Sequence, residues 1–188
     1  MIGSFPITLP LSIIKKIKPK LVYDPFLGSG TTCIAANMAA VSSIGVDISP
    51  PIIPKFKTKA SVTIIKADSR SVKLPQKGID LIITSPPYIG QINYQDKFVK
   101  EEIGSAHLGT SYKARKKYAA DMIKVFQNAL AYLTPKALAF IIVQDKFRLL
   151  DPQASGFRQI HRLTRKVTRV RGIKRGTYFE SVLVWQKA

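Results

Sequence analysis

The stretch LVYDPFLGSGTT, residues 21–32, joins a short apolar run, an acidic residue and a glycine-rich turn. It predicts a buried strand that ends at Asp24, a tight turn around Gly28 and Gly30, and a helix that opens at Thr31. Backbone N–H groups at the start of such a helix bind anionic groups. No Gly-Lys-Ser/Thr follows, so this is not the phosphate loop of nucleotide hydrolases, and a tight turn without a ligand is the alternative.

Further apolar runs repeat the alternation of strand and helix. Strands are expected at residues 43–46, 62–65, 79–83 and 137–143, and a last one at 182–185 pairs with a basic strand near 167–173. Helical spacing of apolar residues over 118–133 predicts a helix that Pro135 ends. The pattern predicts one α/β domain over residues 1–188, with a mostly parallel sheet, an antiparallel C-terminal strand and helices on both faces.

Acidic residues follow three of the expected strands: Asp24, Asp47 and Asp68. In open α/β sheets, ligands bind outside the carboxyl ends of the strands. Asp47 stands where a carboxylate can accept hydrogen bonds from ribose hydroxyls, and Asp68 could meet an adenine amino group. Each residue alone could be a helix cap or a turn residue. Three along one edge of the sheet favour an adenosine-bearing cofactor.

The net charge of +19 favours a polyanionic partner, with a membrane surface or general basicity as the alternatives. Cys33 is the single cysteine, which excludes an internal disulfide and favours an intracellular, cytoplasmic location. No apolar run approaches the roughly 20 residues that cross a membrane, and the N-terminus lacks signal-peptide features. No cluster has metal-ligand spacing.

The expected strand 79–83 ends in Thr84-Ser85-Pro86-Pro87-Tyr88. Adjacent prolines fix two φ angles and remove two backbone donors, so this segment is stiff, and a structural diproline turn is the alternative. Together with Asp-Pro-Phe-Leu-Gly-Ser-Gly-Thr-Thr at 24–32, it resembles the S-adenosylmethionine-dependent amino-methyltransferases of nucleic acids, with the Ser-Pro-Pro-Tyr form similar to the cytosine-N4 branch. The resemblance covers most of the chain, including residues 5–10 and 179–185.

The resemblance implies a Rossmann-like methyltransferase domain that binds S-adenosyl-L-methionine. It implies catalytic roles for Ser85, Pro86, Pro87 and Tyr88: the Ser85 hydroxyl and the Pro86 carbonyl accept amino hydrogens of the target base, and Tyr88 stacks on that base. Methylation at a ring carbon would need a cysteine nucleophile, and Cys33 lies at the cofactor end. The implied cofactor-binding residues are Phe5, Pro6, Ile7, Asp24, Phe26, Gly28, Asp47, Ile48, Asp68 and Ser69.

Two basic segments are candidates for binding nucleic acid, with a solvated surface as the alternative for each. Residues 89–118 form an insertion beside the catalytic segment and are the candidate substrate contact. About fifteen residues separate Asp68 from Thr84, too few for a separate target-recognition domain. The candidate nucleic-acid-binding residues are Lys113, Arg115, Lys116, Lys117, Arg162, Arg165, Lys166, Arg169, Arg171, Lys174 and Arg175.

These observations leave three functions open. The first is methylation of the exocyclic amino group of a base in DNA, with cytosine favoured over adenine. The second is the same reaction on structured RNA, which can present an unpaired base by its shape. The third is an inactive nucleic-acid-binding partner subunit, although Ser85 to Tyr88 are all present. A homodimer or a separate recognition partner is compatible with each of them.

Overall fold

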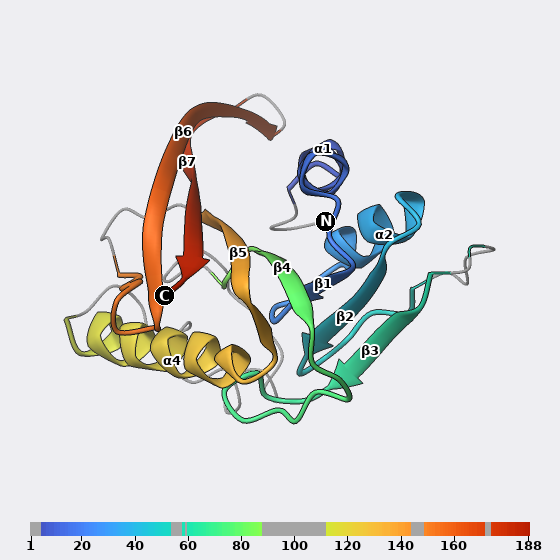
Figure 1. Ribbon diagram of the computed structural model, residues 1–188. Coiled ribbons are helices and arrows are strands. Elements are labelled where there is room, and N and C mark those ends of the chain that lie inside the picture. Colours follow the sequence, from blue (N-terminus) through green and yellow to red (C-terminus); the bar gives the residue numbers. More distant parts are fainter. Residues whose placement is uncertain (1–4, 54–57, 59, 88–111, 144–148, 172–173) are drawn as a thin grey trace.

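The computed structural model describes residues 5–53, 58, 60–87, 112–143, 149–171 and 174–188 (Figure 1). Within these residues, seven strands form one sheet in the order β3-β2-β1-β4-β5-β7-β6. Neighbouring strands from β3 to β5 are parallel, and β7 runs antiparallel to both β5 and β6. The elements are α1 (Thr8–Ile17), β1 (Leu21–Asp24), α2 (Thr31–Met38), β2 (Ser42–Asp47), β3 (Val62–Lys66), β4 (Ile79–Thr84), α4 (Tyr112–Leu130), β5 (Leu133–Val143), β6 (Phe157–Arg171) and β7 (Lys174–Lys187).

The predicted α/β sheet with an antiparallel C-terminal strand is confirmed. One local expectation is wrong: α4 ends at Leu130, and Pro135 lies inside β5. The pairing of β5 with β4 shifts register between Ile79 and Leu81, next to this proline. A break in the ladder accommodates a residue that has no N–H to donate. α4 begins at Tyr112, so the last part of the expected insertion 89–118 is helical, and residues 88–111 lie outside the described part.

Helices cover both faces of the sheet, as expected (Figure 1). α1 and α2 pack over one face, where Ile14 and Val22 belong to the same core. α4 packs over the other face, where Phe126 shares a core with Tyr23 and lies 5.2 Å from Trp185 between ring centroids. Val22 and Tyr23 are adjacent in β1 and serve opposite faces because side chains alternate along a strand. Among the described residues, no helix is long and apolar enough to cross a membrane.

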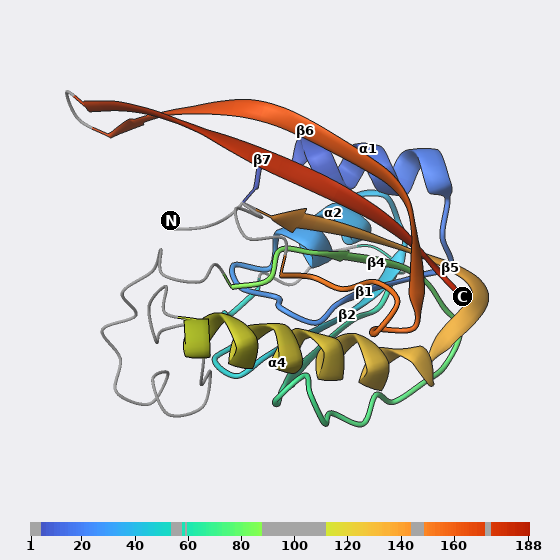
Figure 2. The same ribbon diagram turned by 90° about the vertical axis from the view of Figure 1, so that its left-hand side faces the viewer.

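β6 and β7 form a hairpin that is longer than β5 beside it (Figure 2). Val143, the last residue of β5, pairs with Ser181 of β7, and Ser181 pairs with Thr164 of β6. Residues 165–171 and 174–180 therefore extend past the carboxyl end of β5, and we call them the hairpin arm. The expected last strand at 182–185 forms, but it pairs with residues 159–163 and not with 167–173, which belong to the arm.

Candidate functional site

The candidate site lies at the carboxyl ends of β1 and β4, the neighbouring strands at which the strand order reverses. From β1 the sheet continues through β2 and β3 in one direction, and through β4 and β5 in the other. Ligands of open α/β sheets bind at this kind of switch point. Asp24 and Thr84 are the last residues of these two strands, and Asp47 is the last residue of β2. The three residues therefore lie along one edge of the sheet.

The glycine turn, residues 25–30, connects β1 to α2 as expected and needs glycine at two positions. Gly28 and Gly30 have φ angles of +52° and +83°, which residues with side chains rarely adopt. A Cβ on Gly30 would also lie 2.5 Å from Cδ1 of Ile53. A Cβ on Gly28 would meet, among the described residues, only the carbonyl oxygen of Phe26, at 3.7 Å. The exposed backbone at Gly28 is thus open to a ligand, close to the N–H groups of the first turn of α2.

Asp47 fastens the glycine turn to the end of β2. Its Oδ2 accepts a hydrogen bond from the backbone N–H of Gly28 at 2.8 Å, and its Oδ1 accepts one from that of Ser49 at 2.9 Å. A carboxylate has about four acceptor sites, so both oxygens can take a further donor. Asp47 therefore orients the glycine turn. Its expected contact with ribose stays a prediction.

Asp24 is buried and holds together the two loops at the switch point. Its side chain oxygen Oδ1 accepts hydrogen bonds from the backbone N–H of Phe26 at 3.0 Å and from Oγ1 of Thr84 at 2.7 Å. Burial raises the pKa of Asp24 to about 6, although hydrogen bonds from Thr84, Thr32 and Phe26 work to lower it. With only 2% of Asp24 exposed, its carboxylate supports the turn from within.

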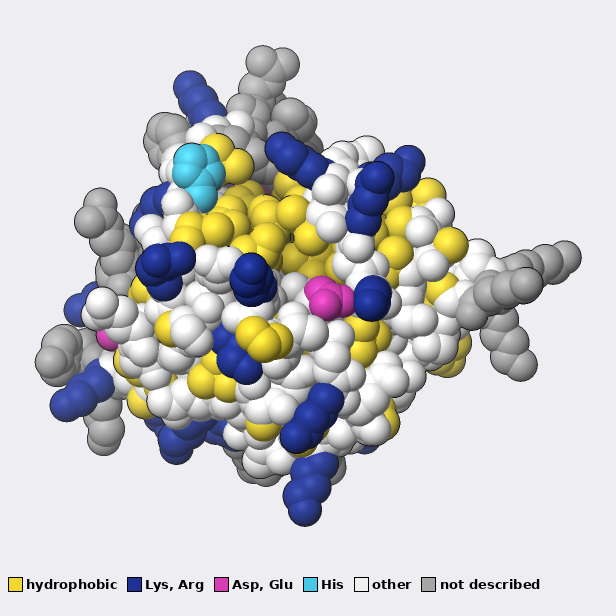
Figure 3. All heavy atoms as spheres, viewed as in Figure 1, with side chains coloured by type: hydrophobic (Ala, Val, Ile, Leu, Met, Phe, Trp, Pro, Cys, Tyr) yellow, Lys and Arg dark blue, Asp and Glu magenta, His cyan; other side chains and the backbone are white. Residues whose placement is uncertain are grey.

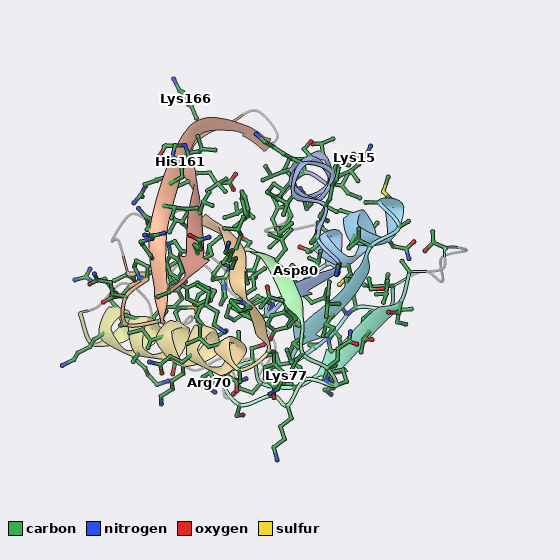
Figure 4. All side chains as sticks on the ribbon, in the orientation of Figure 1. Lys15, Arg70, Lys77, Asp80, His161 and Lys166 are labelled. Atoms are coloured by element: carbon green, nitrogen blue, oxygen red, sulfur yellow. The ribbon has the colours of Figure 1, made fainter. Side chains whose placement is uncertain are left out.

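Asp68 is held in an ion-pair cluster that we define as Asp68, Arg70, Lys117 and Asp121. Arg70 Nη2 lies 2.5 Å from Asp68 Oδ2, and Arg70 Nη1 lies 3.2 Å from Asp121 Oδ1. Lys117 Nζ lies 3.1 Å from the other oxygen of Asp121. Partial burial works to raise the pKa of Asp68, but hydrogen bonds from Arg70 outweigh it and hold that pKa below its usual value. The cluster ties the loop after β3 to α4, beside which Arg70 lies (Figure 4).

Arg70 and Asp121 belong to this cluster, although no sequence motif assigned either of them a role. Arg70 follows the singled-out Asp68 by two residues, and a cation so close to a candidate carboxylate was a usable signal. Asp121 lies on α4, 51 residues from Arg70 along the chain, and its contact could not be read from local sequence.

The Ser-Pro-Pro segment leaves β4 beside Asp24. Thr84 and Pro86 are buried, and Ser85 and Pro87 are half-buried. Tyr88, the fourth expected catalytic residue, lies outside the described residues. Thr84 had no role in the sequence analysis, although it directly precedes Ser85; its partner Asp24 is 60 residues away along the chain. The structure thus brings the two predicted motifs together through a residue to which neither motif gave a function.

The remaining cofactor candidates differ in exposure. Ser69 is buried, and its Oγ donates a hydrogen bond to the carbonyl oxygen of Pro25 at 2.5 Å, which fixes the loop after β3 to the glycine turn. Phe5 is buried in the core beneath α1 and α2, and Ile7 packs against that core. The half-buried candidates are Ile7, Phe26 and Ile48, and the exposed ones are Pro6 and Gly28.

The basic candidates fall on α4 and on the β6–β7 hairpin. On α4, Lys116 and Lys117 are exposed and Arg115 is half-buried. On β6, Arg162 and Lys166 are exposed, and Lys166 points outward (Figure 4). Figure 3 shows many Lys and Arg side chains on this face and few Asp or Glu. The side chains of the other candidates lie outside the described part, but the backbone register places in the hairpin arm Arg165, Arg169, Arg171, Lys174 and Arg175.

Two family models match the chain. The model described as DNA methylase matches residues 3–58, and the model described as Eco57I restriction-modification methylase matches residues 44–175, more than half of the chain. A curated relative, the type II methyltransferase M.MjaII of Methanocaldococcus jannaschii, is 31% identical over an alignment of 156 residues, and the match covers 68% of this chain and 29% of that protein. The chain thus spans less than a third of the length of this relative.

Solved structures show the same fold at low sequence identity. TrmN from Thermus thermophilus has a TM-score of 0.62 and 19% identity, and the match covers 100% of this chain and 50% of TrmN. The 1,6-didemethyltoxoflavin-N1-methyltransferase of Burkholderia thailandensis, solved with bound S-adenosylhomocysteine, has a TM-score of 0.57 and 14% identity over 97% of this chain and 78% of that one. At these identities the likeness concerns the fold alone.

Proposed function

The chain belongs to the family of S-adenosylmethionine-dependent DNA amino-methyltransferases, and from this membership we propose that it transfers a methyl group to the exocyclic amino group of a base, cytosine N4 in DNA. One observation carries the proposal: the Ser-Pro-Pro segment leaves β4 next to the glycine turn, at the switch point of the sheet. A methyl donor held at the turn would thereby meet a base held at Ser85 and Pro86.

The residues at this edge suit S-adenosylmethionine. The donor carries a positive sulfonium, an amino group and a carboxylate, and it supplies an electrophilic methyl group. Asp24 and Asp47 supply negative charge next to the turn, and the N–H groups at the start of α2 suit the carboxylate. Asp47 retains acceptor sites for the ribose hydroxyls. Asp68, with 39% of its side chain exposed, is the candidate partner for the adenine amino group.

Ser85 and Pro86 would prepare the amino nitrogen of the base for attack. This nitrogen is a poor nucleophile because its lone pair is conjugated with the ring. Acceptors placed at its two hydrogens draw it towards a tetrahedral geometry, in which the lone pair is available. Prolines at 86 and 87 make the segment rigid, so little reorganisation is needed during the reaction. The nitrogen would gain the methyl group, the electron pair of the carbon–sulfur bond would stay on sulfur, and one amino proton would pass by way of the acceptors to solvent.

The basic surface supports a nucleic acid as the carrier of the base. Lys116 of α4 and Arg162 and Lys166 of β6 are exposed, and few acidic residues interrupt the basic run of β6. The hairpin arm extends from the sheet at the edge where the parallel strands end. A polyanion that follows this arm would pass the carboxyl ends of β4 and β5, where the base must be presented.

The test is transfer of a labelled methyl group from S-adenosylmethionine to DNA and to RNA, followed by mass spectrometry of the digested nucleosides. We expect N4-methylcytosine from DNA. Ser85→Ala should lower the transfer rate by about a hundredfold while the affinity for S-adenosylhomocysteine stays within about twofold. A label found in 5-methylcytosine would refute amino-group chemistry, and a label found only in RNA would move the substrate to RNA. Full activity of Ser85→Ala would remove the catalytic role.

A further inference from the structure

Backbone pairing between the two functional strands stops before their last residues. β1 pairs with β4 at Val22 with Leu81 and at Tyr23 with Ile82, and the ladder ends there. Asp24 and Thr84, one and two residues further on, are nevertheless fully enclosed, with 2% and 0% exposure. Asp24 keeps a backbone partner in β2, at Gly45, and Thr84 keeps one in β5, at Ile141. Between β1 and β4 themselves, side chains make the connection at the point where both loops of the site begin.

Two buried hydrogen bonds replace the missing ladder. Thr84 Oγ1 donates to Asp24 Oδ1 at 2.7 Å, and Thr32 Oγ1, at the start of α2, donates to the carbonyl oxygen of Ile83 at 3.3 Å. The oxygen that accepts from Thr84 also accepts from the backbone N–H of Phe26 at 3.0 Å. A single carboxylate oxygen thus joins the first residues of the glycine turn to the last residue of β4.

Thr84 is also one peptide bond away from Ser85, which stiff prolines follow. Because this segment is stiff, a rotation of Thr84 would displace the Ser85 hydroxyl and the Pro86 carbonyl as well. Methyl transfer depends steeply on the distance and alignment of the two reacting atoms. The bond between Thr84 and Asp24 spans the two loops that would hold those atoms.

We propose that Thr84 is a positioning residue that couples the methyl-donor loop to the loop that holds the amino group, through its hydrogen bond to Asp24. This inference rests on the proposed function, because it assigns the two loops to donor and acceptor. Thr84 touches neither reactant; it sets the separation of the groups that do. The alternative is that its hydroxyl only satisfies a buried carboxylate and thereby stabilises the fold.

The substitution Thr84→Val tests this inference, because valine keeps the shape of threonine and lacks the hydroxyl. Thr84→Ser keeps the hydroxyl, and Thr63→Val makes the same chemical change in β3, away from both loops. We expect Thr84→Val to lower kcat by about ten- to a hundredfold, with a change of KM for S-adenosylmethionine below about threefold. Thr84→Ser should recover most of kcat, and Thr63→Val should retain it.

The pH profile separates coupling from stability. The hydrogen bond from Thr84 lowers the pKa of Asp24, so its loss raises that pKa and should shift the acidic limb of kcat to higher pH. The other titratable groups that interact with Asp24 are Asp47 at the end of β2, Tyr23 on β1 and Cys33 on α2, and Thr84→Val leaves all of them in place. If Thr84 only stabilises the fold, the raised pKa of Asp24 would appear in the pH dependence of the free energy of unfolding, and the pH profile of kcat would stay that of the wild type.

A second readout does not depend on catalysis. Binding of S-adenosylhomocysteine should shift the amide NMR signal of Ser85 in the wild type and in Thr84→Ser, and by less than half as much in Thr84→Val. If Thr84→Val does not fold, Thr84→Cys, whose thiol is a weak donor, must show the same changes in smaller size. An unchanged Ser85 response together with an unchanged pH profile would overturn the coupling. Absence of methyl transfer by the wild type would instead refute the proposed function, and the NMR comparison would still decide the coupling.

Discussion

Replacement of Asp47 by asparagine tests the cofactor edge with the least change in shape. Asp47 accepts one backbone hydrogen bond on each oxygen, from Gly28 and from Ser49. The amide of asparagine has one acceptor oxygen, so it can serve one of these N–H groups and must turn its own NH₂ towards the other. The same change removes the negative charge that would accept from the ribose hydroxyls.

The expected loss follows from the contacts. A hydrogen bond to a charged group contributes about 1.5–3 kcal/mol, and the low end applies here because Asp47 is half-buried. A loss of about 1.5 kcal/mol in the binding of S-adenosylhomocysteine corresponds to about a tenfold higher Kd. A displaced glycine turn would add to this, so we expect Asp47→Asn to raise Kd by about ten- to thirtyfold.

Isothermal titration calorimetry with S-adenosylhomocysteine measures this change, and Asp80→Asn is the matched control. Asp80 Oδ2 accepts two backbone hydrogen bonds, from Lys20 at 2.8 Å and Leu21 at 3.2 Å. Asp80 lies near the amino end of β4, away from the glycine turn. The control should lose some stability and keep the wild-type Kd. An unchanged Kd in Asp47→Asn, with a lower free energy of unfolding, would show that Asp47 only anchors the turn and would refute the ribose assignment.

Three further predictions concern charge. The pKa of Asp24 is raised to about 6, which favours the protonated carboxyl group in the folded state. The contribution of this group to the free energy of unfolding is therefore present at acid pH and is lost as pH rises through about 6. Asp24→Asn should flatten the pH dependence of the free energy of unfolding, measured in urea, in that range. Arg70→Met should cost about 1–2 kcal/mol at pH 7, with part recovered by Arg70→Lys, and the difference from the wild type should shrink below about pH 4 because the pKa of Asp68 is depressed. The double variant Arg162→Glu, Lys166→Glu should weaken binding to all DNA sequences alike, and the slope of log K against log salt concentration, measured by fluorescence anisotropy, should fall by about two. The control Lys77→Glu, at the opposite end of the parallel strands, should change neither. A loss of binding that depends on DNA sequence would contradict phosphate contact.

Most of the fold could be predicted from the sequence because parallel strands buried on both faces are continuous apolar runs. Leu21 to Tyr23 and Ile79 to Ile83 are of this kind, and both formed strands as expected. The helix end at Leu130 was missed because proline is a common helix stop, whereas here the chain had already turned into β5 before Pro135. The pairing of the last two strands was also misplaced, since register depends on partners that composition does not identify.

The sequence named candidate residues for the site, whose roles stay predictions, but not the contacts between them. Asp24, Asp47 and Asp68 could be found because each follows a strand, and strand ends of a parallel sheet share one edge. A buried or half-buried carboxylate needs hydrogen-bond donors or a cation as partners. The partners used here are Thr84 for Asp24, Gly28 for Asp47 and Arg70 for Asp68. Sequence shows that such partners are required, and only the packed chain shows which ones are used.

The antiparallel direction of β7 brings the basic residues of the hairpin arm to the same end of the sheet as the candidate site. β5 ends at the same edge as β4, and the antiparallel pairing brings the first residues of β7 to that edge. The pairing of β6 with β7 continues beyond that edge as far as Arg171 and Lys174, and it carries the basic residues of the hairpin arm there although they are far from Ser85 in sequence. Helices occupy both faces of the sheet, which leaves this edge as the place where a base can approach the glycine turn. The strand order thus accounts for a basic arm and a row of acidic residues at the same end of the parallel strands: under the proposed function, the arm would suit the phosphates of the substrate, and the acids would suit the positive methyl donor.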